Sequence, residues 1–195
     1  MHRLFAIAGV AFALVLGVGA AAQAATDRVI VAGGCFWCVE ADFEKVPGVK
    51  SVVSGFTGGS LDNPTYEDVS AGGTGHYEAV EIRFDPAKIS YDDVLRLFLR
   101  SVDPLDAKGQ FCDRGDSYRT AIFVSNKAQN ASAKAAVAEA EAHLGQKIAT
   151  PILPTSEFWP ADDYHQDYYK SRDLILTRAG PKQKRNAYTF YREAC

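Results

Sequence analysis

Two cysteines, Cys35 and Cys38, lie three residues apart, with Phe36 and Trp37 between them. They follow an apolar run that ends in two glycines, and they precede an amphipathic stretch. A strand that passes directly into a helix leaves backbone N–H groups without partners at the turn, and their partial positive charge stabilises a thiolate. A lone cysteine is more often a small buried apolar residue, but a second thiol one helical turn away favours redox or metal chemistry. The pattern therefore predicts a reactive, reachable thiolate at Cys35.

Several predicted strands must position this motif. Apolar alternation or short apolar runs predict strands at 28–32, 49–56, 79–84 and 120–124. Two polar loops, 57–75 and 111–118, lead into two of these strands and are expected to face one pocket.

Helix patterns alternate with the strands. Ser90 is expected to cap a helix whose apolar face consists of Val94, Leu95, Leu97, Phe98 and Leu99. An alanine-rich helix should follow at 126–144 and end at Gly145, and a short helix is expected near 164–170. Together the elements predict an α+β fold, a two-layer sandwich of helices packed on one mixed sheet with long wrapping loops.

The first 24 residues have the composition of a targeting segment. An apolar run at 4–22 ends at Ala22. Ala22 and Ala24 are small residues that flank Gln23. This is the pattern of a secretory signal peptide cleaved after Ala24, and the alternative is an uncleaved membrane anchor. We therefore expect an exported protein of the bacterial periplasm, membrane-anchored only if the signal is retained.

Removing 24 residues from the 195 of the chain leaves 171, which fits a single catalytic domain at 25–195 with a C-terminal tail from about 182. The net charge shifts from −3 to −4, because Arg3 is the one charged residue removed. This balance gives no electrostatic reason to expect a nucleic acid partner. Cys35 and Cys38 are too close in sequence to close a useful structural loop, so their spacing favours redox work or metal binding.

Five short motifs carry a resemblance to a known family. They are Gly33-Gly34-Cys35-Phe36-Trp37, Asn63-Pro64-Thr65-Tyr66, Gly75-His76-Tyr77-Glu78-Ala79-Val80, Asp113-Arg114-Gly115-Asp116-Ser117-Tyr118-Arg119 and His165-Gln166. In this order the chain resembles the A-type peptide methionine sulfoxide reductases from about Arg28 to Tyr169. The resemblance implies the ferredoxin-like reductase fold of that family. It also implies reduction of the S epimer of methionine sulfoxide, free or in proteins.

The resemblance assigns the chemistry to named residues. Its nucleophile falls on Cys35 and its acid on Glu78, whose pKa should be raised by burial so that a proton is available near neutrality. Tyr66 and Tyr118 would hydrogen-bond the sulfoxide oxygen, and Asp113 would order those hydrogen bonds.

The resemblance also assigns the substrate contacts. Phe36 and Trp37 would enclose the S-methyl group, and His165 would support substrate binding. We expect no cofactor and no metal.

Reduction would leave Cys35 as a sulfenic acid that condenses with a resolving thiol. Many relatives place resolving cysteines in a glycine-rich C-terminal tail, whereas this tail has basic and aromatic residues and a single Cys195. Cys38 is the favoured first resolver because a Cys-X-X-Cys pair bridges with little backbone change. Cys112 and Cys195 stay as alternatives, or as a relay or structural pair.

Two other function classes fit the cysteine motif less well. A general thiol–disulfide oxidoreductase should have a long helix after the motif, whereas Pro47 and Gly48 interrupt this one early. A zinc-binding module generally needs a second ligand pair. We therefore expect a monomeric reductase whose partners are oxidised protein or peptide methionine and a thioredoxin-like reductant, with no membrane contact after cleavage.

Overall fold

The computed structural model describes residues 26–170, so the expected signal peptide, the C-terminal tail and Cys195 lie outside the described residues. Its centre is a six-stranded sheet in the order β7-β6-β1-β3-β2-β8. The strands are β1 (Asp27–Gly33), β2 (Val49–Thr57), β3 (Tyr77–Phe84), β6 (Thr120–Val124), β7 (Ile152–Pro154) and β8 (Trp159–Pro160). All neighbours pair antiparallel except β6 and β7, which are parallel, so the sheet is mixed as predicted.

Side-chain alternation along β1 divides the interior into two layers. Val29 and Val31 belong to the main core beneath the helices, whereas Ile30 and Ala32 belong to a smaller cluster on the opposite face. Leu153 and Phe158, from the segment after the last helix, pack against that second cluster. Successive strand residues point to opposite faces, which is why β1 is buried on both sides.

Three helices cover the main core, namely α1 (Phe36–Phe43), α3 (Tyr91–Ser101) and α4 (Lys127–Leu144). The predicted start of α3 is confirmed, because the Ser90 hydroxyl accepts a hydrogen bond from the Asp93 N–H at 3.1 Å. The prediction for Leu97 is wrong, since this side chain is exposed. At 100° per residue it lies away from the stripe formed by Val94, Leu95, Phe98 and Leu99.

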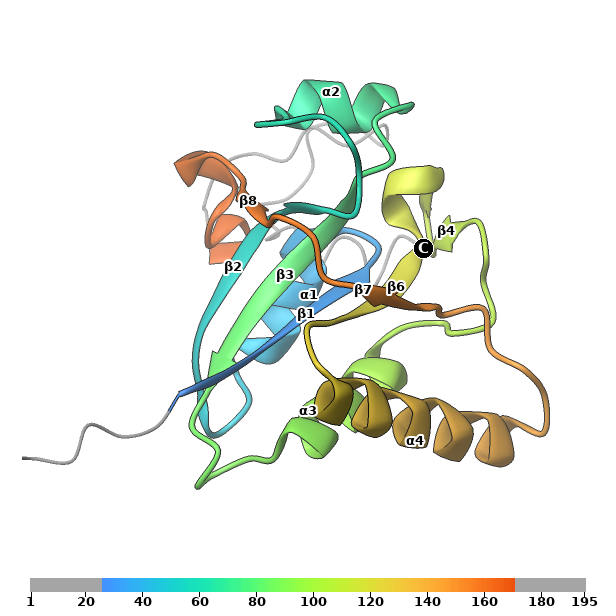
Figure 1. Cartoon of the computed structure of the whole chain (residues 1–195). Helices are drawn as coiled ribbons and strands as arrows, with labels where there is room; N and C mark the ends of the chain where they lie inside the picture. The colour runs from blue at the N-terminus through green and yellow to red at the C-terminus, as the bar shows by residue number, and fades with distance from the viewer. Residues whose placement is uncertain (1–25, 171–195) are drawn as a thin grey trace, which may run out of the picture.

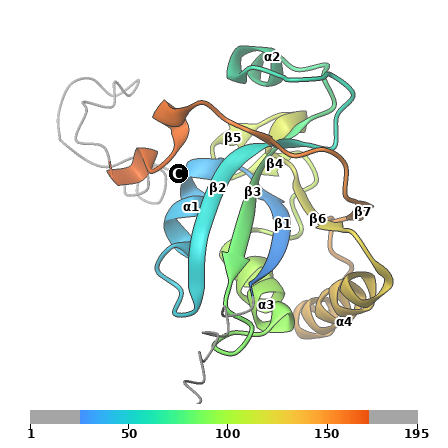
Figure 2. The ribbon, with the colours of Figure 1, turned by 60° about the vertical axis from the view of Figure 1, so that its left-hand side comes forward.

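The predicted α4 is also confirmed. Asn126 caps its first turn by accepting the Gln129 N–H at 2.9 Å, and Gly145 ends it with a left-handed backbone, φ 69°. Figures 1 and 2 show α3 and α4 side by side at one end of the molecule and the short α2 (Tyr66–Ala71) at the other.

The remaining elements are short. β4 (Gly109–Gln110) and β5 (Asp113–Arg114) form a separate hairpin, and η1 (Asp116–Tyr118) is a single 3₁₀ turn after it. The short helix expected near 164–170 is instead two 3₁₀ turns, η2 (Asp163–His165) and η3 (Tyr168–Lys170). Asp167 between them has φ 56°, a left-handed conformation that interrupts any continuous helix.

The fold brings the cysteine motif to one edge of the sheet. Because β1 and β3 are antiparallel, the end of β1, which leads into Cys35, lies beside the start of β3, which carries Glu78. Between residues 26 and 170, no helix has the length and apolar character required to cross a bilayer.

Candidate active site

Cys35 is placed by a tight turn from strand to helix. It is the residue before the first turn of α1, and it follows Gly34, which has a left-handed φ of 81°. A Cβ atom at Gly34 would lie 2.5 Å from the Cβ of Gln110, so only glycine permits the approach of the β4–β5 hairpin. The turn leaves Cys35 only 5% exposed.

The expectation that the helix terminus holds Cys35 as a thiolate is wrong for the resting protein. Burial raises the pKa of Cys35 well above its ordinary value, and the Cys38 thiol and the negative charge of Glu78 add to the rise. The N–H of Phe36, the first of the helix, donates to Glu78 Oε2 at 3.1 Å. The first N–H of the helix therefore binds the Glu78 carboxyl group rather than the Cys35 sulfur, and Cys35 is a thiol in the resting protein.

Glu78 is the acidic group of the site. It is 2% exposed at the start of β3, and its pKa is raised to about 8, mainly by burial and further by the charge of Asp113. Hydrogen bonds from Phe36 N–H and Tyr118 act in the opposite direction. The rise expected for a carboxyl group beside an aromatic pocket is present, so Glu78 is protonated at neutral pH.

Two tyrosines and one aspartate adjoin this carboxyl group. Tyr66 begins α2 and Tyr118 ends η1, and their hydroxyls lie in hydrogen-bonding contact. Burial raises the pKa of Tyr66 to about 12, so the phenol keeps its proton. The charge of Asp113 in β5 raises the pKa of Cys35, Glu78 and Tyr66 together, which places Asp113 at the same pocket.

Aromatic rings enclose the other side of the site. Phe36 and Trp37 have ring centroids 5.9 Å apart, and Trp37 is stacked with Tyr66 at 6.4 Å. His165, from a turn 128 residues further along the chain, accepts a hydrogen bond at Nδ1 from Trp37 Nε1, at 3.1 Å. These rings form an apolar wall beside Cys35 and Glu78.

His165 has a defined protonation state. An indole nitrogen only donates, so Nδ1 is the acceptor and Nε2 carries the hydrogen. Burial lowers the pKa of His165, which keeps the ring neutral, and its buried Nε2 has no hydrogen-bond partner among residues 26–170.

Comparison with known proteins identifies the family. Residues 27–193 match the family model described as "Peptide methionine sulfoxide reductase". The chain is 46% identical to peptide methionine sulfoxide reductase MsrA 2 of Rhizobium meliloti over 175 residues, which cover 90% of this chain and 81% of the relative. The chain belongs to the A-type peptide methionine sulfoxide reductases.

Solved structures of the family share the fold. Methionine sulfoxide reductase A of Corynebacterium diphtheriae is similar with a TM-score of 0.70 and 29% identity, over 80% of each chain. Reduced Mxr1 of Saccharomyces cerevisiae is similar with a TM-score of 0.71 and 27% identity, over 74% of this chain and 84% of Mxr1. The predicted family, the α+β class and the enzyme class, peptide-methionine (S)-S-oxide reductase, are confirmed.

The cysteines divide into two kinds. Cys35 and Cys38 are free, and their thiols are in hydrogen-bonding contact. Cys112 is exposed in the turn of the β4–β5 hairpin and takes part in a disulfide. Cys195 lies outside the described residues. Of the described cysteines, only Cys38 is a free thiol beside the nucleophile.

One member of the wall was not predicted from the sequence. Tyr168 is stacked on Trp37 with ring centroids 3.8 Å apart and an interplanar angle of 15°. Nothing local distinguishes Tyr168 from the other tyrosines of the chain. The adjacent His165-Gln166 motif was the one available signal that this segment reaches the site.

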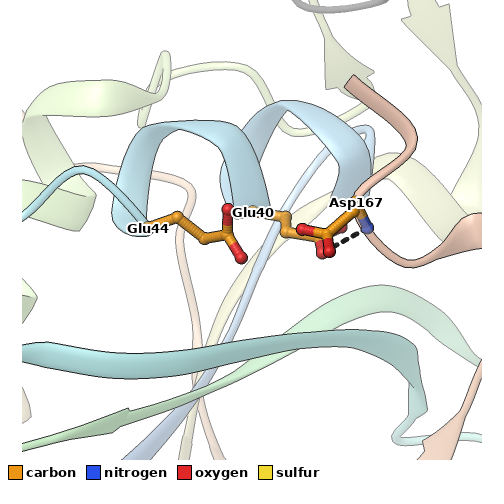
Figure 3. Close-up of side chains that lie close together, drawn as sticks. All are labelled: Glu40, Glu44 and Asp167. Carbon is orange, nitrogen blue, oxygen red and sulfur yellow. Dashed lines mark hydrogen bonds between the residues drawn. The ribbon is translucent and has the colours of Figure 1, made fainter. Parts of the chain in front are cut away.

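Three carboxylates, one from α1, one from the residue after it and one from the 160–170 segment, form the one group among residues 26–170 with the spacing of a metal site. Oxygens of Glu40, Glu44 and Asp167 lie within 4.8 Å of one another, and Figure 3 shows them between α1 and the 160–170 segment. The ammonium group of Lys170 lies 2.6 Å from Glu44 and 2.5 Å from Asp167. A side chain of the protein therefore already supplies the positive charge that a cation would bring.

Proposed function

We propose that this enzyme reduces the S epimer of methionine sulfoxide, free or within proteins, with Cys35 as nucleophile and Glu78 as acid. The observation that carries the proposal is the buried carboxyl group with a pKa of about 8, held 3.1 Å from the N–H of the residue after Cys35. At neutral pH this group holds a proton that a sulfoxide oxygen can accept. Protonation of that oxygen makes the sulfoxide sulfur more electrophilic.

The first step transfers one oxygen atom. The sulfur of Cys35 bonds to the sulfoxide sulfur while Glu78 protonates the oxygen, and the thiol proton of Cys35 returns to Glu78. The hydroxyl group then passes to the sulfur of Cys35 as the sulfur–sulfur bond and the sulfur–oxygen bond of the substrate break, leaving a thioether and a cysteine sulfenic acid. Tyr66 and Tyr118 stabilise the oxygen during the transfer, and Asp113 orders these groups.

The aromatic wall supplies the substrate contacts. The S-methyl group packs against Phe36 and Trp37, and His165 supports this contact by accepting a hydrogen bond from Trp37 Nε1. The sulfoxide oxygen is held at Glu78 and the methyl group at Trp37, and the rest of the substrate side chain must extend out of the pocket. Only one configuration at the sulfoxide sulfur meets all three conditions. This three-point arrangement supports selection of a single epimer.

The second step forms a disulfide. The Cys38 thiol attacks the sulfenic acid of Cys35, water leaves, and the two sulfurs are joined. A dithiol reductant of the thioredoxin kind then opens the bridge by exchange, and the crystal structure of yeast Mxr1 in complex with Trx2 supports this choice of partner. Cys112 and Cys195 serve as a later relay or as a structural pair.

The enzyme is proposed to work outside the cytoplasm as a monomer. Residues 1–24 form the signal peptide, and 25–195 form a single catalytic domain in the periplasm. The mass of the protein recovered from the periplasmic fraction tests the cleavage after Ala24, and its elution volume in size-exclusion chromatography tests the monomer.

The reaction is tested by supplying a dithiol with the separate S and R epimers. We expect turnover of the S epimer alone and its loss in Cys35→Ser. Reduction of insulin without sulfoxide turnover would instead favour a general thiol–disulfide oxidoreductase. Stoichiometric zinc binding with neither activity would favour a metal-binding module.

The resolving cysteine is tested by mass mapping after a single turnover without reductant. A Cys35–Cys38 bridge is expected. A dominant bridge from Cys35 to Cys112 or Cys195 would reject Cys38 as first resolver.

A further inference from the structure

Glu40 is a buried carboxylate that the reaction does not use. It lies on α1 one turn beyond Phe36 and is 1% exposed. Its Oε2 accepts a hydrogen bond from the Ser54 hydroxyl and its Oε1 accepts one from the Asp167 N–H, both at 2.8 Å. One side chain thus joins α1 to β2, through Ser54, and to the 160–170 segment, through Asp167; Figure 3 shows the second of these hydrogen bonds.

Gln166 completes the same junction. Its Oε1 accepts the Ser54 N–H, and its Nε2 donates to the carbonyl groups of Ser54 and Ala161, each at 2.9 Å. Both the side chain and the backbone of Ser54 are therefore engaged, the former by Glu40 and the latter by Gln166. Together these five hydrogen bonds hold the segment that contains Gln166 and Asp167 against α1 and β2.

The residues on either side of this junction contact Trp37, the ring that the proposed function places against the S-methyl group. His165 precedes Gln166 and accepts from Trp37 Nε1, while Tyr168 follows Asp167 and is stacked on the Trp37 ring. Trp37 and Glu40 are three positions apart on α1, so they lie on neighbouring parts of the same helix surface. A shift of the segment would move His165 and Tyr168, two of the ring partners of Trp37, together.

We propose that Glu40, together with Gln166, is a positioning residue that sets the place of the Trp37 wall and so determines selection for a methyl group on the sulfoxide sulfur. The inference rests on the proposed function and names the specificity of that site. It acts by hydrogen-bond geometry, because the two donors require acceptor atoms at fixed points. A glutamine at 40 keeps both contacts with one of them reversed, since its oxygen accepts from Asp167 and its amide donates to the Ser54 hydroxyl, which can also accept.

Three variants separate this role from general stability. In Glu40→Leu we expect the ratio of kcat/KM for methionine sulfoxide over ethionine sulfoxide to fall about tenfold, with KM affected more than kcat. Glu40→Gln should restore the wild-type ratio within about twofold. Asp42→Asn is the matched control on the same helix, because Asp42 is half-buried and makes no hydrogen bond or ion pair with the rest of 26–170.

A second readout does not depend on the reaction. The chain has two tryptophans, so a Trp159→Phe background isolates the emission of Trp37. Glu40→Leu should shift this emission to longer wavelength and increase its quenching by acrylamide, and Glu40→Gln should not. If the wild-type protein reduces neither sulfoxide, the proposed function fails and the emission alone decides the positioning role.

Weaker variants cover the case in which Glu40→Leu does not fold. Ser54→Ala removes one of the two donors to Glu40, and Gln166→Ala removes the backbone contacts. Each should change selectivity and Trp37 emission in the same direction by a smaller amount. Unchanged selectivity and emission in these variants would overturn the proposal, as would a Glu40→Gln enzyme as impaired as Glu40→Leu.

Discussion

Two buried glutamates near α1, Glu78 and Glu40, have different surroundings. Glu78 shares its pocket with the Cys35 thiol and the charge of Asp113, and it receives one backbone N–H, from Phe36. Glu40 has no thiol beside it and accepts from Ser54 and Asp167. Burial raises the pKa of both. The difference teaches that burial alone does not make a carboxyl group an acid catalyst, because its neighbours decide whether its proton reaches a reacting atom.

The comparison is broken most directly by replacing each glutamate with glutamine. Glu78→Gln removes the proton donor and should lower kcat/KM for the S epimer by about a hundredfold or more. Glu40→Gln keeps its hydrogen bonds and should stay near the wild-type rate. Initial rates with a dithiol reductant measure both, and equal losses in the two variants would contradict the distinction.

The pH dependence of the rate should sharpen the comparison. Glu78 acts in its protonated form, so kcat/KM should fall as pH rises through about 8. The profile of Glu40→Gln should keep this alkaline decline, and the residual activity of Glu78→Gln should lack it. A decline that persists in Glu78→Gln would assign it to another group.

The raised pKa of Glu78 should also appear, as a smaller effect, in the pH dependence of the free energy of unfolding. Folded Glu78 keeps its proton up to about 8, whereas an unfolded glutamate loses it near its ordinary pKa, so the folded state binds more protons between these values. The free energy of unfolding should therefore fall with rising pH across this window, by about 1.4 kcal/mol per unit from this group. Urea unfolding of Glu78→Gln should show a shallower slope. Glu139→Gln, which removes an exposed carboxylate paired with Arg96, should retain the wild-type slope.

The smallest effect is expected when the hydroxyl group beside each glutamate is removed, that of Tyr118 beside Glu78 and that of Ser54 beside Glu40. Tyr118 lowers the pKa of Glu78 by hydrogen bonding, so Tyr118→Phe should move the alkaline decline upward by a fraction of a pH unit. Ser54→Ala removes the hydroxyl next to Glu40 and should leave that decline in place. Profiles measured on the same substrate distinguish them, and a downward shift in Tyr118→Phe would count against the assignment.

Local patterns predicted the long elements of this fold but not the short ones. β1, β2, β3 and β6 have enough alternation or apolar length to be recognised, the cap at Ser90 identifies the start of α3, and the alanine-rich composition identifies α4. β7 and β8 are formed by pairing with β6 and β2, so no local period indicates them. The amphipathic pattern is recognisable only after Cys38, whereas the helix α1 already begins at Phe36.

The sequence identified the residues of the site better than it predicted their protonation states. The motifs named Cys35 and Glu78, and the fold places both at one edge of the sheet. The protonation of Cys35 was misjudged because the burial of a thiol depends on distant segments that a sequence does not locate. Tyr168 was missed for the same reason, since its partner Trp37 is far away in the chain.

The missing side chain at Gly34 limits how this protein can change over evolutionary time. Gln110, which occupies the space beside Gly34, pairs directly with Asp113 across the hairpin. A lineage that gained even a methyl group at 34 would have to displace that hairpin, and with it an acidic group of the pocket. A larger residue at position 34 would therefore require a compensating change in the β4–β5 hairpin.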